Sequence, residues 1–556
     1  MKRIRQHAQP LSAVATLAVA MLALTFSLAA LPAQAQTITT LYNFGGVNGD
    51  PTLTFGTMAQ GRDGQFYGIS QAGPIGGTTN NGVVYKISSA GVVTDLHTVT
   101  TSEGQTCNGL TLGSDGNFYG TCHDGGANSI GTLFKVTPTG TLTVLHNFGS
   151  GTDGCRPLAA PIQGIDGNFY GTTTFCGVNN YGTAYKFTPA GAYTQLYSFK
   201  GPPTDTALPG GLVQGSDGNF WGMGNGWIIS NGGVFKMTPA GKETLVYSFS
   251  STEDGNPYDS LVQGSDGNYY GTTYGGGGTF EGSVFKLTPK GVETVLYKFP
   301  NQTQGAFPRL PLTQGPDGLL YGIATNCSGG GCAQAGIFDI STTGAYSNLY
   351  LYPILNGNNN ELPYSPLLLS TDGKFYSATE QGGTHFSGSF YSLSTTYAPF
   401  VSLVTLRSGK LGTQVGILGQ GFSSSSVVKF GGTSATTTAL TGSTFILATV
   451  PTGAHTGTVT VTTGATTLTS PKTFKILPAI TSFTPAAGPP GTSVHISGTE
   501  LSQATRVTFG GVAATSFTVN SDSLVTATVP ATGKTGKIAI TTPGGVATSA
   551  ATFTVN

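Results

Sequence analysis

The stretch Gly113-Ser-Asp-Gly-Asn-Phe-Tyr-Gly120 decides the fold, because it returns along this 556-residue chain with only small changes. Seven copies are present, and the aspartate recurs at intervals of 49 to 55 residues. The seven aspartates are Asp63, Asp115, Asp166, Asp217, Asp266, Asp317 and Asp372. Self-similarity at a fixed period of this length is typical of repeat architectures, in which each repeat is one supersecondary unit.

Each repeat has the pattern of four short strands. In the fifth copy we expect strands over 259–264, 268–273, 282–288 and 292–299. Asp-Gly between alternating apolar runs predicts a hairpin with a type I′ turn, in which both central residues have positive φ. Thr-Pro-x-Gly predicts the second turn, because proline presets φ and glycine accepts a positive φ. Four strands in about 50 residues is the period of a β-propeller blade.

The two ends of the repeat array complement one another. Ile38-Thr-Thr-Leu-Tyr-Asn-Phe44 matches a fourth strand but precedes the first Asp-Gly copy. The seventh copy reaches Gly388-Ser-Phe-Tyr-Ser-Leu393 and has no fourth strand of its own. An N-terminal strand that completes the last sheet closes the ring and removes the exposed edges. The sequence therefore predicts a seven-bladed β-propeller over 36–397, with an open solenoid as the alternative.

The aromatic pair that recurs in each repeat is expected to lie in the hydrophobic core and not to form a surface on which a ligand stacks. Neighbouring residues of a strand point to opposite faces, and both faces of a blade pack on other blades. The pairs are Phe66-Tyr67, Phe118-Tyr119, Phe169-Tyr170, Phe220-Trp221, Tyr269-Tyr270, Leu320-Tyr321 and Phe375-Tyr376. The repeated aspartate is expected to be a turn residue, because it lacks the further spaced carboxylates of a calcium loop.

Composition excludes two classes of protein. Charged residues make up 9% of the chain and the formal net charge is zero, so no basic excess exists to bind nucleic acid. The chain is 38% apolar and 10% aromatic, which argues against intrinsic disorder.

The first 35 residues have the pattern of a secretory signal peptide. Lys2, Arg3 and Arg5 precede an apolar run, and Ala33-Gln34-Ala35 is a small-x-small cleavage site. The alternative is a membrane anchor, because the run approaches the ~20 residues needed to span a bilayer. We expect cleavage, export to the cell surface or medium, and no transmembrane segment after removal of the signal.

The C-terminal region changes character near residue 400. Residues 36–399 carry 13 basic and 22 acidic side chains, whereas 400–556 carry 8 and 2. Two segments, 398–477 and 478–556, repeat one another, and short alternating strands predict two small β-sandwiches. The second contains P-x-I-x-x-F-x-P from Pro478, G-x-x-V-x-I-x-G to Gly498, then V-x-F-G-G and V-P in order. This pattern resembles the IPT/TIG domain, an immunoglobulin-like fold, which implies spacer or interaction modules.

The propeller repeat, DGNFYGTT…GG…GtvFKlTP, resembles the GloVer tandem repeat of exported bacterial proteins. The resemblance covers about 360 residues and implies architecture and location, with no assigned activity. The repeat is also loosely similar to the repeats of streptogramin-lyase-like propellers, whose Asp-Gly-Asn-aromatic element suits any such hairpin.

Six cysteines in an exported chain favour disulfides. Cys107 and Cys122 flank one Asp-Gly turn with the same offset as Cys155 and Cys176 flank the next. We expect each pair to bridge its hairpin, and Cys327 and Cys332 to pin one loop. The alternative is a metal site, which the spacing disfavours because it contains no CxxC pair.

The sequence contains no complete catalytic motif. His97 and His146 stand where other repeats carry Tyr, so we expect them to be substituted outer-strand residues. His123-Asp124 is a candidate acid/base pair in a loop between strands. The candidate ligand-binding residues are aromatics and a histidine of the variable loops: Trp227, Tyr274, Phe280, His385 and Phe386.

The sequence predicts an exported, non-enzymatic binding or adhesion protein for glycan or a surface protein, without cofactor or metal. The alternative is an extracellular carbohydrate-active or lyase enzyme that uses the central pocket. An enzyme would gather His, Asp or Glu from several blades near the axis.

Overall fold

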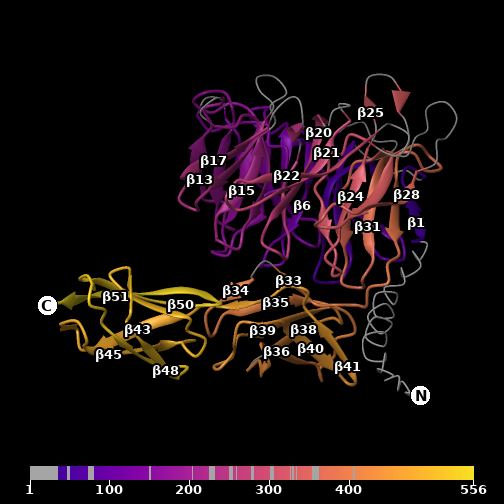
Figure 1. Cartoon of the computed structure of the whole chain (residues 1–556). Helices are drawn as coiled ribbons and strands as arrows, with labels where there is room; N and C mark the ends of the chain where they lie inside the picture. The colour runs from indigo at the N-terminus through magenta and orange to yellow at the C-terminus, as the bar shows by residue number, and fades with distance from the viewer. Residues whose placement is uncertain are drawn as a thin grey trace, which may run out of the picture. The chain divides into compact units, whose positions relative to one another are not determined.

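The computed structural model contains β-strands throughout its described part (Figure 1). It describes residues 36–46, 50–72, 81–149, 152–202, 205–224, 232–249, 254–257, 259–276, 281–300, 306–325, 327–328, 331–332, 335–352, 362–404, 407–436 and 438–556. None of these ranges holds a helix that is long and apolar enough to cross a bilayer. The predicted signal peptide, 1–35, lies outside them.

The repeats form antiparallel four-stranded sheets of the kind that make propeller blades. The third repeat has the order β10 (Ile162–Gln163), β11 (Phe169–Thr173), β12 (Thr183–Phe187), β13 (Tyr193–Ser198). The fourth has β14 (Pro209–Gln214), β15 (Phe220–Gly224), β16 (Gly233–Met237), β17 (Glu243–Ser248). The fifth has β18 (Asp254–Pro257) and β19 (Val262–Gln263) on β20 (Tyr269–Gly276), then β21 (Ser283–Leu287) and β22 (Glu293–Lys298). The sixth has β23 (Thr313–Gln314), β24 (Leu320–Ala324), β27 (Gly336–Ile340), β28 (Tyr346–Leu351), with the hairpin β25 (Cys327–Ser328) and β26 (Gly331–Cys332).

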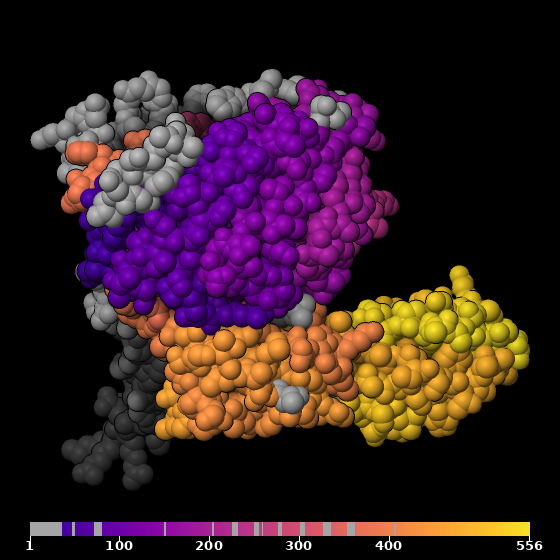
Figure 2. Space-filling view, turned by 180° about the vertical axis from the view of Figure 1, so that it is seen from behind, coloured from indigo at the N-terminus to yellow at the C-terminus, as the bar shows by residue number. Residues whose placement is uncertain are grey.

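The first two repeats share one eight-stranded sheet. Its order is β5 (Val93–Thr98), β4 (Val83–Ile87), β3 (Phe66–Ala72), β2 (Thr52–Gln60), β6 (Gln105–Leu112), β7 (Phe118–Asp124), β8 (Thr132–Val136), β9 (Leu142–Asn147). A single parallel pair, Thr57 with Gly109, joins the two four-stranded halves. The innermost strands of neighbouring repeats therefore approach each other closely. From behind, the first repeats form one continuous surface (Figure 2).

The N-terminal strand completes the last sheet, as the sequence predicts. β1 (Ile38–Asn43) pairs antiparallel with β32 (Ser389–Leu393), which continues to β31 (Phe375–Gln381), with β29 (Leu362–Pro363) and β30 (Leu368–Leu369) on its far side. Phe44 follows β1 and is fully buried, in one cluster with Phe66 and Phe390. Residues from the first and the last repeat therefore share a core around this strand.

The Asp-Gly turn differs from the predicted type I′ geometry. Only its glycine has positive φ, from 79° to 90° across the seven copies, and the aspartates are absent from the left-handed residues. In the second repeat, Gly116 N–H donates to the Gly113 carbonyl, and Gly113 N–H donates to Asn117 across the turn. Asp115 Oδ1 accepts the Asn117 N–H at 3.1 Å, which holds the aspartate right-handed. The turn is thus a longer one that ends on a left-handed glycine.

The same aspartate accepts a hydrogen bond from the second aromatic residue of its repeat. Six tyrosine hydroxyls donate to these carboxylates at 2.7–2.9 Å; they belong to Tyr67, Tyr119, Tyr170, Tyr270, Tyr321 and Tyr376. Their rings are at most 2% exposed, so the prediction of core aromatics is confirmed. Burial first, and then this contact, raises the pKa of the Tyr119 hydroxyl, which therefore stays a donor.

The fourth repeat provides a natural control for this contact, because Trp221 replaces the tyrosine. We expect Asp115→Ala to lower the free energy of unfolding by about 1–3 kcal/mol, since it leaves a buried hydroxyl short of its partner. Asp217→Ala removes the same turn contacts but takes no partner from a tyrosine of its repeat. It should therefore lower the free energy of unfolding by less. Urea titration of both variants measures the difference, and equal losses would mean that the turn alone matters.

Side chains also link each repeat to the next. A glutamine at the end of an innermost strand accepts a backbone N–H from the turn of the preceding repeat. The pairs are Gln163 with Ser114, Gln214 with Ile165, Gln263 with Ser216, Gln314 with Ser265 and Gln60 with Thr371. At the two remaining junctions, Arg62 donates to the Ser114 carbonyl and Thr313 to the Leu367 carbonyl. The Gln60 contact joins the first repeat to the last.

Each C-terminal module has two sheets around its own core. One sheet of the first module has the order β33 (Ser402–Val404), β35 (Gln414–Leu418), β39 (Phe445–Thr449), β38 (Thr438–Thr441). The other has the order β37 (Thr433–Ser434), β36 (Val427–Phe430), β40 (Val459–Thr463), β41 (Thr466–Thr469). A separate two-stranded pair joins β34 (Ser408–Gly409) and β42 (Lys475–Ile476). The second module has β43 (Ala479–Thr484), β45 (Ser493–Thr499), β49 (Leu524–Thr528), β48 (Phe517–Ser521) against β44 (Ala487–Gly488), β51 (Gly545–Val555), β50 (Gly536–Thr542), β46 (Arg506–Phe509), β47 (Val512–Ala513). Alternating buried valine and isoleucine on β45 and β50 supply the inward face.

Candidate functional site

All seven repeats contribute to one cavity of about 350 Å³, here called the axial cavity. Its lining comes mainly from the innermost strand of each repeat or from the segment just before that strand, six to nine residues before the repeated aspartate. The seven contributions are Phe55 to Thr57, Thr106 with Asn108, Leu158 with Ala159, Gly210 with Gly211, Asp259, Arg309 with Leu310, and Tyr364 with Pro366. Gln71 and His123 join them, each eight residues after its own aspartate.

The lining positions differ from copy to copy, unlike the turn and core positions. Seven residues before the aspartate, the repeats carry Gly56, Asn108, Ala159, Gly210, Asp259, Leu310 and Ser365. A repeat that needed this position only for packing would keep one residue type. This variation at a fixed register is the sequence signal for the cavity, and none of the predicted ligand-binding residues lies at this position.

Asp259 is the only carboxylate on the described lining of the cavity. Burial raises its pKa to about 6, although hydrogen bonds to Ser260 act in the opposite direction. No ion pair joins it to a basic side chain within the described part of the chain. A carboxyl group with a raised pKa in a cavity marks a candidate functional residue.

His123 lines the same cavity, and the carboxylate of Asp124 orients its imidazole ring. Its Nδ1 lies 2.8 Å from Asp124 Oδ2, and Arg156 Nε lies 3.4 Å from Asp124 Oδ1. With Nδ1 donating to the carboxylate, Nε2 is the nitrogen left to act as an acceptor. The predicted His123-Asp124 pair therefore exists, and its histidine lines the axial cavity.

Arg309 and the predicted ligand residue Tyr274 form a stack at the cavity. The guanidinium carbon of Arg309 lies 4.3 Å from the centre of the Tyr274 ring. That ring also packs against Phe307, at 5.0 Å between ring centres. Tyr274 is half-buried and is not a lining residue, so in this structure it supports Arg309 and does not itself face the cavity.

An aromatic pair and an amide complete the lining. Phe55 and Tyr364 come from the first and the last repeat, and their ring centres lie 6.0 Å apart. Asn108 Nδ2 donates to the Pro157 carbonyl at 2.7 Å, which fixes the amide in place. Flat apolar rings beside fixed polar groups are typical of sites for small molecules.

The chain enters most innermost strands through a left-handed residue that is not glycine. The residues are Leu53, Thr106, Arg156, Leu208, Asn256 and Phe307, with φ between 51° and 56°. Non-glycine residues in this conformation are uncommon and cluster at functional sites. Each lies nine or ten residues before its repeated aspartate, so this conformation recurs in the repeats, and Thr106 is itself on the lining of the axial cavity.

The remaining predicted loop residues lie away from the cavity lining. Trp227 and Phe280 fall outside the described residues. His385 and Phe386 lie in the exposed loop between β31 and β32, where Phe386 is 58% exposed. The structure thus does not bring His385 or Phe386 together with the residues that line the cavity.

Two predicted disulfides are present. Cys107 bonds to Cys122 between β6 and β7, and Cys155 bonds to Cys176 in the next repeat. Cys327 and Cys332 are register partners of β25 and β26, but their side chains lie outside the described part, so that bridge stays a prediction. The two bonds indicate an oxidising compartment.

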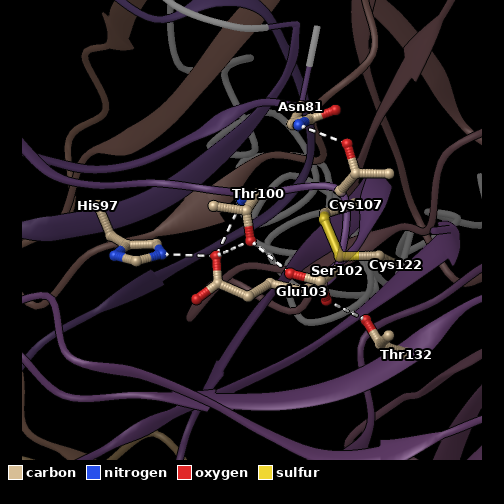
Figure 3. A network of polar contacts seen from close by, with 9 residues as sticks. Asn81, His97, Thr100, Ser102, Glu103, Cys107, Cys122 and Thr132 are labelled. Atoms are coloured by element: carbon tan, nitrogen blue, oxygen red, sulfur yellow. Dashed lines mark hydrogen bonds and ion pairs between the residues drawn. A yellow bond between two sulfur atoms is a disulfide. The ribbon is translucent and has the colours of Figure 1, made fainter. Parts of the chain in front are cut away.

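His97 lies on β5 and His146 on β9, the outer strands of their sheets, as predicted, and each has a carboxylate partner. His97 Nε2 lies 2.9 Å from Glu103, whose carboxylate also accepts from Thr100 beside the Cys107–Cys122 bond (Figure 3). His146 pairs with Asp153 at 2.9 Å. In two other repeats a tyrosine takes the same role, namely Tyr42 with Asp50 and Tyr197 with Asp205.

One group of described residues has the chemistry of metal ligands. His455, Glu500 and Asp522 each offer a ligand atom, and these atoms lie within 4.8 Å of one another. Burial first, and then the neighbouring Asp522, raises the pKa of Glu500 to about 7. Asp522 already accepts a hydrogen bond from Ser502 at 2.7 Å. The group is remote in sequence from the repeats and does not contribute to the axial cavity.

Comparison with solved structures finds distant likenesses. A fungal alcohol oxidase of the AA5 family is 11% identical, with 94% of this chain and 100% of that chain covered and a TM-score of 0.43. The aldose sugar dehydrogenase of Streptomyces coelicolor is 12% identical, with 65% and 99% covered and a TM-score of 0.37. SGBP-B from a xyloglucan utilization locus of Bacteroides uniformis is 22% identical, with 28% of this chain and 48% of that chain covered and a TM-score of 0.15. These likenesses carry no argument about activity. A search of curated proteins gave no match.

Family models match most of the chain. The Gloeobacter/Verrucomicrobia repeat matches residues 26–164 and 157–391, and the IPT/TIG domain matches 399–476 and 478–555. The first match includes the strands, the turns and every contribution to the axial cavity. The chain therefore belongs to the Gloeobacter/Verrucomicrobia repeat family and carries two IPT/TIG domains after its repeats.

Proposed function

We propose that the protein is an exported, non-enzymatic binding protein built on a seven-bladed β-propeller, with the axial cavity as its ligand site. The observation that carries this proposal is the convergence of all seven repeats on one cavity. Its lining is mostly apolar or backbone, with a few polar side chains at fixed places, as in sites for small ligands. The ligand is a glycan or a protein-derived group, held at the axis and not on the variable loops.

The predicted signal peptide places this binding outside the cytoplasm. The two disulfides support an oxidising location, because such bonds are rare in reducing compartments. The two IPT/TIG domains act as a spacer or docking arm, the role that such modules imply. With the signal removed, the protein is secreted or held at the cell surface.

The alternative function is an extracellular carbohydrate-active or lyase enzyme. One observation favours it: His123, oriented by Asp124, borders the same cavity as Asp259. Two titratable groups in different environments are the usual parts of an acid/base pair. An enzyme of this kind would use His123 Nε2 as the base and the Asp259 carboxyl as the acid.

The test uses residues 36–556 with a panel of polysaccharides and peptidoglycan, and measures retention and soluble product together. Retention without product supports the binding proposal, whereas product release supports the enzyme. Tyr364→Ala, on the cavity lining, should reduce retention at least tenfold. Phe386→Ala is the matched control, because this aromatic is exposed and does not line the cavity. Loss of retention in the Phe386 variant alone would overturn the axial site.

A further inference from the structure

Three side chains with metal-ligand chemistry meet at the junction of the two IPT/TIG domains. His455 lies between β39 and β40 of the first domain, Glu500 between β45 and β46 of the second, and Asp522 between β48 and β49. One ligand atom of each lies within 4.8 Å of the other two. Only Leu477 and Pro478 separate β42, the last strand of the first domain, from β43. So short a connection, with a proline of fixed φ, limits how far the ligands can move apart.

Glu500 is a buried carboxylate with an unsatisfied oxygen. The residue is 4% exposed, and among the described residues Oε1 has no hydrogen-bond partner. Its other oxygen, Oε2, lies 4.0 Å from His455 Nδ1, which is longer than a hydrogen bond. A buried charge is costly unless it is paired or coordinates a metal ion. This oxygen, beside an imidazole and a second carboxylate, therefore points to a cation as its partner.

The two IPT/TIG domains provide an internal comparison, because residues 413–432 and 492–511 align without a gap. Glu500 stands where the first domain has Gly421, and both residues have left-handed φ, 58° and 67°. Glycine adopts this conformation freely, whereas a residue with a side chain adopts it at a cost. The second domain therefore carries a glutamate at a position where the fold itself favours glycine.

The other two ligands also differ from their counterparts. The same alignment places Ser443 at the position of Asp522, and Lys534 at the position of His455. The cores of the two domains, by contrast, consist of buried apolar residues in both. The fold common to the two domains thus forms without these three side chains, which are additions to it.

Asp522 has a structural role that is compatible with metal binding. Its Oδ1 accepts the Ser502 hydroxyl at 2.7 Å and the Ser502 N–H at 3.3 Å. Its Oδ2 accepts the Glu500 N–H at 3.4 Å. A carboxylate has about four acceptor sites, so these bonds orient the group and leave capacity for a further partner. They hold the Asp522 carboxylate beside Glu500.

We propose that His455, Glu500 and Asp522 bind one divalent transition-metal ion of the zinc type, which links the two IPT/TIG domains. One imidazole nitrogen and two carboxylate oxygens suit zinc, whereas calcium takes about six to eight oxygen ligands. Atoms bound at ~2 Å to one ion lie about 3–4 Å apart, so the 4.0 Å between His455 Nδ1 and Glu500 Oε2 needs little adjustment. The His455 side chain is 41% exposed, which gives the ion a path from solvent. The inference is independent of the axial cavity.

The experiment uses residues 36–556 without an affinity tag, after removal of metal with EDTA. Calorimetric titration with zinc chloride should show one ion per chain, and calcium chloride should show no binding under the same conditions. Zinc should also raise the melting temperature, because a ligand that binds only the folded state stabilises it.

The variants take the residue that the other domain carries at the same position. They are His455→Lys, Glu500→Gly and Asp522→Ser, and each should weaken zinc binding at least tenfold and remove the melting shift. In EDTA, Glu500→Gly should melt no lower than the parent, because it removes a buried carboxylate and a left-handed side chain. His495→Ala is the matched control, since this exposed histidine of β45 contacts Thr526 and is not in the ligand group.

Four results would overturn the inference. Absence of zinc binding to the metal-free protein would reject the site, and binding that all three variants retain would place the ion elsewhere. Calcium binding as tight as that of zinc would reject the transition-metal assignment. Loss of binding in the Glu500 and Asp522 variants but not in His455→Lys would reject the link between the domains. None of these results decides the proposed function, which is tested by retention on polysaccharide and peptidoglycan.

Discussion

A chain that lacks residues 36–46 is expected to lose the monomeric folded state of its repeat region. This deletion removes β1, which pairs with β32 over five residues, and leaves one backbone edge of the fully buried strand β32 without hydrogen-bond partners. It also removes Phe44, whose full burial corresponds to about 3–5 kcal/mol on truncation. An unpaired, apolar strand edge promotes association between chains. Light scattering after size exclusion, and thermal melting by circular dichroism, measure both effects.

A deletion of similar length elsewhere serves as the control. Removal of residues 545–556 takes away β51 from the second IPT/TIG domain and should leave the melting of the repeats unchanged. A synthetic peptide of residues 36–46, added in trans, should restore a monomer by occupying the free edge. If the shortened chain remained a monomer with an unchanged melting temperature, closure by β1 would not be needed for stability.

Loss of a disulfide is the second large effect. The loops closed by Cys107–Cys122 and Cys155–Cys176 span 15 and 21 residues. Each bond should contribute about 3 kcal/mol, because it restricts the unfolded chain. We expect the Cys107→Ala, Cys122→Ala double variant to unfold at clearly lower urea concentration, and the corresponding pair at 155 and 176 to do the same.

Reduction of the parent protein provides an independent measure. Dithiothreitol should lower the urea midpoint of the parent by about as much as both double substitutions together. The fourfold alanine variant should respond little, apart from any effect at Cys327 and Cys332. Equal responses of the parent and the fourfold variant would show that these two bonds add no stability.

The strand pattern could be predicted because the same pattern of apolar and turn residues recurs in every repeat. The closing strand 38–44, the buried aromatic pairs and two disulfides all follow from register, and the structure contains them. The prediction of a type I′ turn is wrong, because it considers only the backbone φ angles. The Asp115 side chain accepts the Asn117 N–H and so keeps the aspartate out of the left-handed region.

The candidate site was harder to predict, because its residues are about 50 positions apart. No single strand shows why Asp259, Arg309 and His123 belong together; only the closed arrangement of repeats brings them to one cavity. Tyr274 was identified, but for contact with ligand, whereas the structure places it under Arg309. His123-Asp124 was identified correctly as a pair, because its partners are adjacent in sequence.

The glutamine contacts between repeats affect how the repeat region comes apart. In an open array the end units have one neighbour each, so they fray first and unfolding spreads inward. Here Gln60 holds Thr371, and every repeat has a partner on both sides. Opening any one repeat breaks two interfaces at once. Hydrogen exchange should therefore report one common opening energy for the inner strands of all repeats, without a gradient from either end.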